Sequence, residues 1–301
     1  MSSWPRVVAA ADLGSNTVKI SIASVSADGA IVEISNGAET IRLGAGIERT
    51  GAIDPDRIRQ CVDVLSDYEQ RARALGARTF IGIATEALRV AHNADVLLDR
   101  IAEVTAWRIR VISGDEEARL TFVGLRERVP DSGSSLVADI GGGSTELIRA
   151  QDGQMRDHLS LPVGSGRLAD RYFSSDPPPQ AVLDMVTRAA VDALGTCALL
   201  DDAECVVLCG GNGVFLAQLT EQVLGEPVTT ESLQRLLVHF AAEPAARTAA
   251  RLGIAHERAR VLPAGAAIAL AILRLSAPGE VRCVPSGLRI GLIREWALGS
   301  A

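Results

Sequence analysis

Hydrophobic positions in the first part of the chain change from strand-like to helix-like spacing. Runs rich in Val, Ile and Ala predict three consecutive β-strands at about 6–12, 17–25 and 30–36. The stretch "DPDRIRQCVDVLSDYEQRARALG" then predicts a helix, because Asp54 suits the N-cap, Pro55 suits the first turn and apolar residues share one face until Gly76. Strands and helices alternate after it, at about 78–84, 93–105, 107–112 and 114–128. This order is typical of an α/β domain.

The same order of elements begins again near residue 135. Strands are expected for "LVADI", "TELIRA" and "MRDHLSL", followed by helices, a strand "ECVVLC" and a mostly helical end. The turn between the first two strands is also repeated, as "DLGSNT" at 12–17 and "DIGGGSTE" at 139–146. We therefore predict an α/β protein of two duplicated βββαβα domains, residues 1–128 and 129–301, with an interdomain active-site cleft. The last helix, at about 287–297, could pack back on the first domain.

Length and composition are compatible with two soluble domains. The 301 residues exceed the usual size of a single core, and 48% hydrophobic residues suffice for buried cores. The longest apolar runs, such as "AIALAIL" from residue 266, are expected to be too short to span a bilayer. No basic segment leads into an apolar stretch with a cleavage site. We expect a cytoplasmic protein without membrane association.

Net charge and cysteine content limit the kinds of ligand that the protein is expected to bind. A net charge of −7 argues against nucleic-acid binding, so a polyanionic ligand would depend on local positive charge or on a metal ion. The five cysteines are an odd number and are interpreted as buried apolar residues, with a zinc site or a disulfide as the alternative.

The two repeated turns have the composition of an anion-binding site. Their small residues let backbone N–H groups converge, and side-chain donors are added by Ser15, Asn16, Ser144 and Thr145. Asp12 and Asp139 each stand at a strand end, where a carboxylate can hold Mg²⁺ or its waters. Two ordinary tight hairpins with solvated aspartates are the alternative. The matching positions of the two turns favour the phosphate and metal interpretation.

Two common nucleotide motifs are absent from the sequence. No G-x-G-x-x-G opens a helix, and no Gly-Lys-Ser/Thr is present. The paired turns instead resemble those of the actin, Hsp70 and sugar-kinase superfamily, whose domains are ribonuclease H-like. That resemblance alone implies an ATPase or a kinase.

Further motifs make a more specific resemblance. In order along the chain they are "DLGSNTVKI", "ATEALRVAHN", "SGDEEARLTFVGL", "DIGGGSTEL" and "LPVGSGRL". Together they resemble the exopolyphosphatase and guanosine pentaphosphate phosphatase (Ppx/GppA) family in its short two-domain form. The chain departs from the family pattern at "GGNG", where Gly-Gly-Thr is more frequent, and at "VPSGLRIG", a compressed form of the family's ending.

The resemblance implies roles for individual residues. Glu117 matches the catalytic glutamate, which would orient the attacking water and accept its proton. Arg89 matches a phosphate-binding arginine. The implied ligands of Mg²⁺, with Mn²⁺ as the alternative, are Asp12, Asp139 and Glu146. The remaining implied phosphate contacts are Ser15, Asn16, Gly142, Gly143, Ser144, Gly164 and Ser165.

Some of these residues also have plainer interpretations. Glu117 and its neighbour Glu116 stand in a first helical turn, where acidic residues are favoured by the helix dipole alone. Arg119 is better interpreted as an ion-pair partner, and Lys19 lies within a strand.

The sequence leaves three classes of function open. Removal of the terminal phosphate from inorganic polyphosphate is the leading hypothesis. Hydrolysis of the 5′ terminal phosphate of guanosine pentaphosphate is the second. The third is an ATP-dependent kinase or an actin-like ATPase, and a noncatalytic phosphate sensor is a further possibility. A homodimer is expected from the family alone.

Overall fold

The computed structural model describes residues 5–285 and 287–299. Contacts divide the chain into two compact units. Unit one comprises Met1–Leu125 and Gly287–Ala301, and unit two comprises Arg126–Ser286. The sequence pattern placed a domain boundary after residue 128, whereas this division falls after residue 125 and assigns the last helix to unit one.

Unit one is a five-stranded mixed sheet with helices. Its strands are β1 (Arg6–Leu13), β2 (Thr17–Val25), β3 (Ile31–Thr40), β4 (Thr79–Ala84) and β5 (Arg108–Val111). Its helices are α1 (Ile47–Thr50), α2 (Pro55–Ala74), α3 (Glu86–Val90), α4 (Ala94–Val104), α5 (Gly114–Leu125) and α13 (Leu288–Gly299). The strand order is β3-β2-β1-β4-β5, in which β1, β4 and β5 are parallel and the first three strands form an antiparallel meander.

Unit two repeats this topology. Its strands are β6 (Ser134–Ile140), β7 (Thr145–Gln151), β8 (Gln154–Leu161), β9 (Cys205–Cys209) and β10 (Glu280–Val284). The order β10-β9-β6-β7-β8, read from its other end, matches that of unit one, with β6, β9 and β10 parallel. Its α-helices are α6 (Ser165–Tyr172), α7 (Gln180–Leu194), α8 (Gly210–Leu219), α9 (Thr230–Ala242), α10 (Ala245–Leu252), α11 (His256–Ala259) and α12 (Leu262–Ser276). Shorter helical turns are η1 (Arg126–Arg128), η2 (Ala198–Leu200) and η3 (Thr220–Leu224). The predicted duplication of an α/β unit is therefore confirmed.

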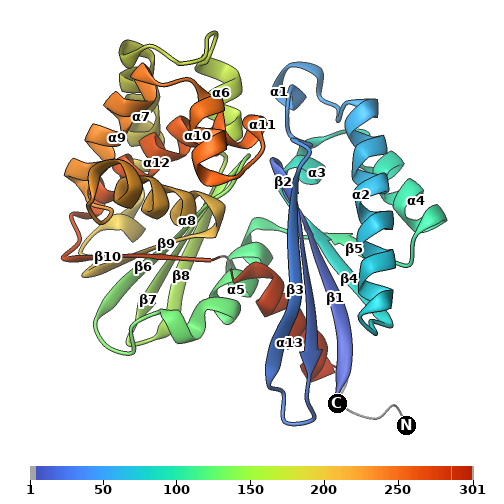
Figure 1. Cartoon of the computed structure of the whole chain (residues 1–301). Coiled ribbons are helices and arrows are strands. Elements are labelled where there is room, and N and C mark those ends of the chain that lie inside the picture. Colours follow the sequence, from blue (N-terminus) through green and yellow to red (C-terminus); the bar gives the residue numbers. More distant parts are fainter. Residues whose placement is uncertain (1–4, 286, 300–301) are drawn as a thin grey trace. The chain divides into compact units, whose positions relative to one another are not determined.

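The sheet of unit one is covered by helices on both faces. Alternate residues of β1 point to opposite sides. Ala9 and Ala11 pack with residues of α2 and α4, whereas Val8 and Ala10 pack with residues of α5 and α13. Figure 1 shows α2 and α4 on one side of this sheet and α13 on the other. The alternation places Asp12 on the face that α5 covers.

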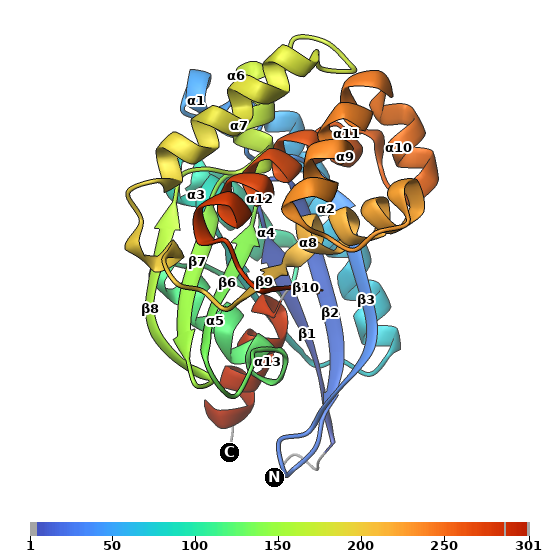
Figure 2. The same cartoon turned by 90° about the vertical axis from the view of Figure 1, so that its left-hand side faces the viewer.

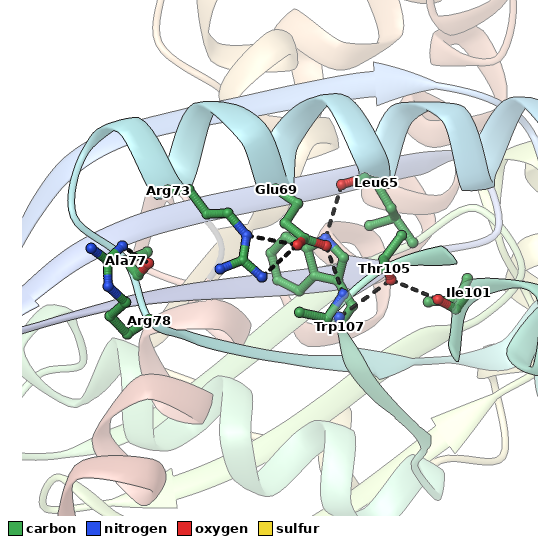
Figure 3. Close-up of polar contacts among 9 residues, drawn as sticks. Leu65, Glu69, Arg73, Ala77, Arg78, Ile101, Thr105 and Trp107 are labelled. Carbon is green, nitrogen blue, oxygen red and sulfur yellow. Dashed lines mark hydrogen bonds and ion pairs between the residues drawn. The ribbon is translucent and has the colours of Figure 1, made fainter. Parts of the chain in front are cut away.

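Hydrogen bonds join the C-terminal half of α2 to the residues that directly precede β5 (Figure 3). The indole N–H of Trp107 donates to the Leu65 carbonyl at 2.9 Å. Glu69 accepts the Ala106 N–H at 2.6 Å and pairs with Arg73. Trp107 is buried and directly precedes β5. The bonds therefore hold the start of β5 in place, and α5 is the next helix after this strand.

Glycines allow α5 and α13 to lie in direct backbone contact. A Cβ atom at Gly291 would overlap the Leu120 carbonyl oxygen, and one at Gly124 would overlap the Gly287 carbonyl. An ion pair between Arg119 and Glu295, at 2.6 Å, joins the same two helices. Because the obstructing atoms belong to backbone, a side chain at these positions would force the helices apart.

Gly291→Ala is therefore expected to destabilise the protein by about 1–3 kcal/mol, since overpacking must displace α13 from α5. Urea unfolding monitored by circular dichroism would measure the change. Gly299→Ala is the matched control, because a Cβ there meets no atom of the described residues within 4 Å. An equal effect of both substitutions would contradict the packing argument.

The core of unit two is built around α12. This helix packs against α6, α7, α8 and α9, and its residues from Leu262 to Leu273 are buried (Figure 2). Among the described residues, one stretch, His256–Ser276, is long and apolar enough to cross a membrane by length and composition. The apolar run recognised in the sequence is a shorter part of it. Of the most apolar window of the stretch, 83% is buried inside the protein, as expected for a core helix.

Strand β10 was not predicted from the sequence, for which a mostly helical end was expected. Only five residues, Glu280–Val284, form it, and it lies at the sheet edge beside β9. Short edge strands carry little hydrophobic periodicity, because much of their surface stays in water. The parallel pairing with β9 is what fixes this segment as a strand.

Candidate active site

The candidate residues of unit one gather at one edge of its sheet. Asp12 lies next to the end of β1, Arg89 is in α3 directly after β4, and Glu117 is in α5 after β5. Because β1, β4 and β5 are parallel, their carboxyl ends meet at the same edge. Asp12 and Glu117 are 105 positions apart in the sequence, and the topology brings them to one edge of the sheet.

Arg89 and Glu117 are in direct contact. Arg89 Nη1 lies 2.8 Å from Glu117 Oε2 and also donates to the Ile112 carbonyl oxygen at 2.9 Å. The Glu117 side chain is 10% exposed and that of Arg89 21%. A carboxylate held this way has a fixed orientation, and the guanidinium fork retains further N–H groups that can bind an oxyanion.

The first turn, residues 12–17, is held by the loop that follows β3. Gly44 N donates to the Ser15 carbonyl and Arg42 N to the Asn16 carbonyl, each at 2.8 Å. In a trans peptide the next N–H points opposite to the carbonyl, so the Asn16 N–H is directed away from this loop. The Ser15 hydroxyl donates to Glu86 Oε2 at 3.0 Å. Its proton is therefore directed to a carboxylate.

Glu86 was not among the candidates from the sequence, although it stands in the motif "ATEALRVAHN". It is 7% exposed, and its buried carboxylate lies within hydrogen-bond distance of the first turn. Asp12 also has a charged neighbour. Lys19, the cross-strand partner of Asp12 on β2, places Nζ 3.9 Å from Asp12 Oδ2.

The second turn, residues 141–144, has its carbonyl groups bound on one side. The Gly141 oxygen accepts the Ser165 N–H at 2.9 Å and the Ser165 hydroxyl at 3.1 Å. The Gly142 oxygen accepts the Arg167 N–H at 2.9 Å, and the Gly143 oxygen accepts Arg167 Nε at 3.0 Å. These donors all belong to α6, so the carbonyls of the turn point toward that helix.

The opposite side of the second turn is rich in N–H groups. Because each N–H points away from the preceding carbonyl, those of Gly142, Gly143 and Ser144 point away from α6. Successive N–H groups on one side of a glycine turn form an anion-binding concavity. Gly164 lets α6 approach this closely, since a Cβ there would lie 2.5 Å from backbone atoms of Gly142 and Gly143.

Two carboxylates lie on the strands that the second turn connects. Asp139 on β6 and Glu146 on β7 are direct partners in the antiparallel register. Glu146 is 1% exposed, and its Oε1 accepts the hydroxyls of Ser144 at 2.7 Å and Ser160 at 2.9 Å. In both units, therefore, the turn serine donates to a buried glutamate.

Asp139 lies against the beginning of α8. A Cβ at Gly210, which has φ of 78°, would lie 2.5 Å from Asp139 Oδ1. The N-terminus of a helix favours a negative charge. Gly210 is thus required both by its positive φ and by the approach of the carboxylate.

Arg258 is a further candidate that was not predicted from the sequence. It is 8% exposed, burial lowers its pKa to about 10, and the charge of Asp139 opposes that decrease. Its guanidinium lies 5.6 Å from the Phe215 ring centroid and closely approaches Gly211. It remains charged at neutral pH and places a buried cation near Asp139. No local signal marks it, because "HERAR" has the composition of an exposed helix.

The metal-binding capacity of these carboxylates is limited. Within residues 5–285 and 287–299, no group of three or more His, Cys, Asp or Glu side chains is arranged to hold a metal ion by itself. Any metal at Asp139 and Glu146 would therefore need ligands from water or substrate, as is usual for Mg²⁺ bound with phosphates.

The sequence is similar to those of several known proteins. The family model described as "Ppx/GppA phosphatase family" matches residues 21–299. The chain is 30% identical over 294 residues to "Exopolyphosphatase 1" of Mycobacterium leprae, covering 94% of this chain and 87% of that relative. It is 29% identical to "Guanosine-5'-triphosphate,3'-diphosphate pyrophosphatase" of Vibrio atlanticus, covering 97% of this chain and 59% of that relative.

The solved structures include the Ppx/GppA family member of Aquifex aeolicus. It is 26% identical, has a TM-score of 0.76 and is matched over 98% of both chains. The actin-like fold class and the family resemblance predicted from the motifs are thereby confirmed. From the family model and the relatives together, we conclude that this chain belongs to the Ppx/GppA phosphatase family.

Proposed function

We propose that this protein is an exopolyphosphatase, which transfers the terminal phosphoryl group of inorganic polyphosphate to water. The observation that carries the proposal is the contact of 2.8 Å between Arg89 and Glu117. It pairs a group able to accept a proton with a group able to hold a phosphoryl oxygen. The name of the Mycobacterium leprae relative supports this choice of substrate.

Each group has a defined task in this proposal. Glu117 orients the attacking water and accepts its proton. Arg89 keeps Glu117 in place through Nη1 and binds the transferred phosphoryl group with its other donors. The N–H groups of Gly142, Gly143 and Ser144 bind phosphate oxygens, because the carbonyl that precedes each of them is held by α6 and the N–H points the other way.

We further propose a requirement for Mg²⁺, with Mn²⁺ as the alternative. The donor set of unit two is suitable, since Asp139 and Glu146, which are direct partners in the antiparallel register, both present hard carboxylate oxygens. When bound, the ion would neutralise charge on the phosphoryl oxygens. Ser144 and Ser160 hold the Glu146 carboxylate in a fixed orientation by hydrogen bonds.

Hydrolysis of guanosine pentaphosphate is the alternative function, supported by the name of the Vibrio atlanticus relative. Phosphate release from long-chain polyphosphate, guanosine pentaphosphate and ATP would separate the candidates, each assayed with Mg²⁺ and with EDTA. The proposal predicts the highest kcat/KM for polyphosphate and no release in EDTA. A preference for guanosine pentaphosphate would favour the alternative, and release from ATP alone would contradict both.

Arg89→Ala is expected to raise KM for polyphosphate by about tenfold to a hundredfold, the effect of losing a charge-assisted hydrogen bond. It should also lower kcat, because Glu117 loses the partner that orients it. Steady-state kinetics would measure both. Arg110→Ala is the control, since Arg110 is 47% exposed and pairs with Glu116 instead. An unchanged KM in Arg89→Ala would refute the assignment.

A further inference from the structure

Asn212 is a fully buried polar residue in the first turn of α8, within the "GGNG" segment. Its Nδ2 donates to the Ile140 carbonyl at 2.5 Å and lies 3.4 Å from the Ser165 hydroxyl oxygen. Ile140 is the last residue of β6, directly before the second turn, and Ser165 is the first residue of α6. One side-chain amide thus contacts both segments that define the anion-binding turn.

The other polar atom of this amide has no hydrogen-bond partner among the described residues. Asn212 Oδ1 is buried, and it faces Gly265 on α12, where a Cβ would overlap it. Rotating the amide by 180° would place this oxygen against the Ile140 carbonyl oxygen, so the observed orientation is the one that supplies a donor there. An unpaired buried acceptor lowers stability. A contribution to stability alone therefore does not explain why an asparagine side chain is buried at position 212.

The bond to Ile140 acts on the peptide that opens the second turn. The Ile140 carbonyl and the Gly141 N–H belong to the same planar peptide unit. That N–H donates to the Ser144 carbonyl at 2.9 Å and closes the turn. The Ser165 hydroxyl, next to the amide, donates to the Gly141 carbonyl at 3.1 Å. Fixing these two successive peptide planes sets the direction of the N–H groups that follow.

We propose that Asn212 is a positioning residue for the phosphate site of unit two. It touches no substrate, and it acts by holding the second turn with its N–H groups directed at a phosphate oxygen. The inference deepens the proposed function, on which it rests for the identity of the ligand. It also gives a physical role to the asparagine of the "GGNG" segment.

Asn212→Ala and Asn212→Thr test this inference. Ala removes the donor, and we expect the Kd for inorganic phosphate and the KM for polyphosphate to rise about tenfold while kcat changes by less than about threefold. Threonine keeps a hydroxyl group that can donate and lacks the amide oxygen that has no partner. The Kd for inorganic phosphate and the KM for polyphosphate should therefore stay within about threefold of the wild-type values. Thr220→Ala is the matched control, a fully buried hydroxyl of unit two that bonds only to Ala217 among the described contacts.

Hydrogen exchange of the amides in residues 139–147 supplies a readout that requires no activity. The inference predicts faster exchange in Asn212→Ala, but not in Asn212→Thr or Thr220→Ala. Unchanged exchange in Asn212→Ala, or equal defects in the Ala and Thr variants, would overturn it. If the wild-type protein left polyphosphate intact yet Asn212→Ala weakened phosphate binding, the proposed function would fail and this inference would stand. If the wild type hydrolysed polyphosphate and Asn212→Ala had an unaltered KM, this inference would fail and the proposed function would stand.

Discussion

Glu117→Gln is expected to lower kcat for polyphosphate by about 10²–10⁴-fold, with little change in KM. Glutamine has the same shape as glutamate, and its side-chain oxygen can still accept the hydrogen bond from Arg89 Nη1. It cannot take a proton from water, so the substitution removes the chemical step while leaving the geometry in place. Steady-state rates of phosphate release give kcat and KM separately.

Glu116→Gln is the matched control for this experiment. Glu116 is the preceding residue in the same helical turn, but its side chain is 27% exposed and pairs with Arg110 at 2.5 Å. Its loss should change kcat by no more than about threefold, as for other surface substitutions. Equal losses in the two variants would support the plainer interpretation, in which both acids only favour the helix dipole.

Gly164→Ala is expected to raise KM for polyphosphate by about a hundredfold, because a displacement of roughly 1 Å in a binding group can cost that much. The added Cβ would lie 2.5 Å from backbone atoms of Gly142 and Gly143, which have no side chain to rotate away. The second turn must therefore move away from α6 and lose its bonds to Ser165 and Arg167. Kinetics and the Kd for inorganic phosphate would both report the change.

The control for Gly164→Ala is Gly279→Ala, also in unit two. A Cβ at Gly279 would meet the Glu204 carbonyl oxygen at an ordinary distance of 3.6 Å. This variant should bind phosphate as the wild type does. Normal binding by Gly164→Ala would show that the second turn does not form the phosphate site.

The fold was largely predictable because its strands and helices are long and strongly patterned. The repeat of an aspartate-led turn indicated the duplication, and the shared strand order of the two sheets confirms it. The shortest helices and strands were harder to predict from the sequence. Helices α1 and α3 and strand β10 contain at most five residues and, unlike the equally short β9, include charged residues that interrupt the apolar pattern.

The candidate site was predictable by residue type, but its pairings were not. The motifs named Arg89 and Glu117 separately, whereas their contact arises from the order of the parallel strands. Glu86 and Arg258 were missed because they are distinguished from other charged residues only by being buried. The neighbouring sequence does not show whether a charged residue is buried. The magnesium requirement, the homodimer and the cytoplasmic location remain predictions.

Hydrolysis of long-chain polyphosphate in H₂¹⁸O, with Mg²⁺ present, would test the central claim most directly. We predict that orthophosphate is released from the chain end, that each phosphate carries one ¹⁸O atom from water, and that Glu117→Gln abolishes the release. Internal fragments, or orthophosphate without the label, would contradict terminal attack by water.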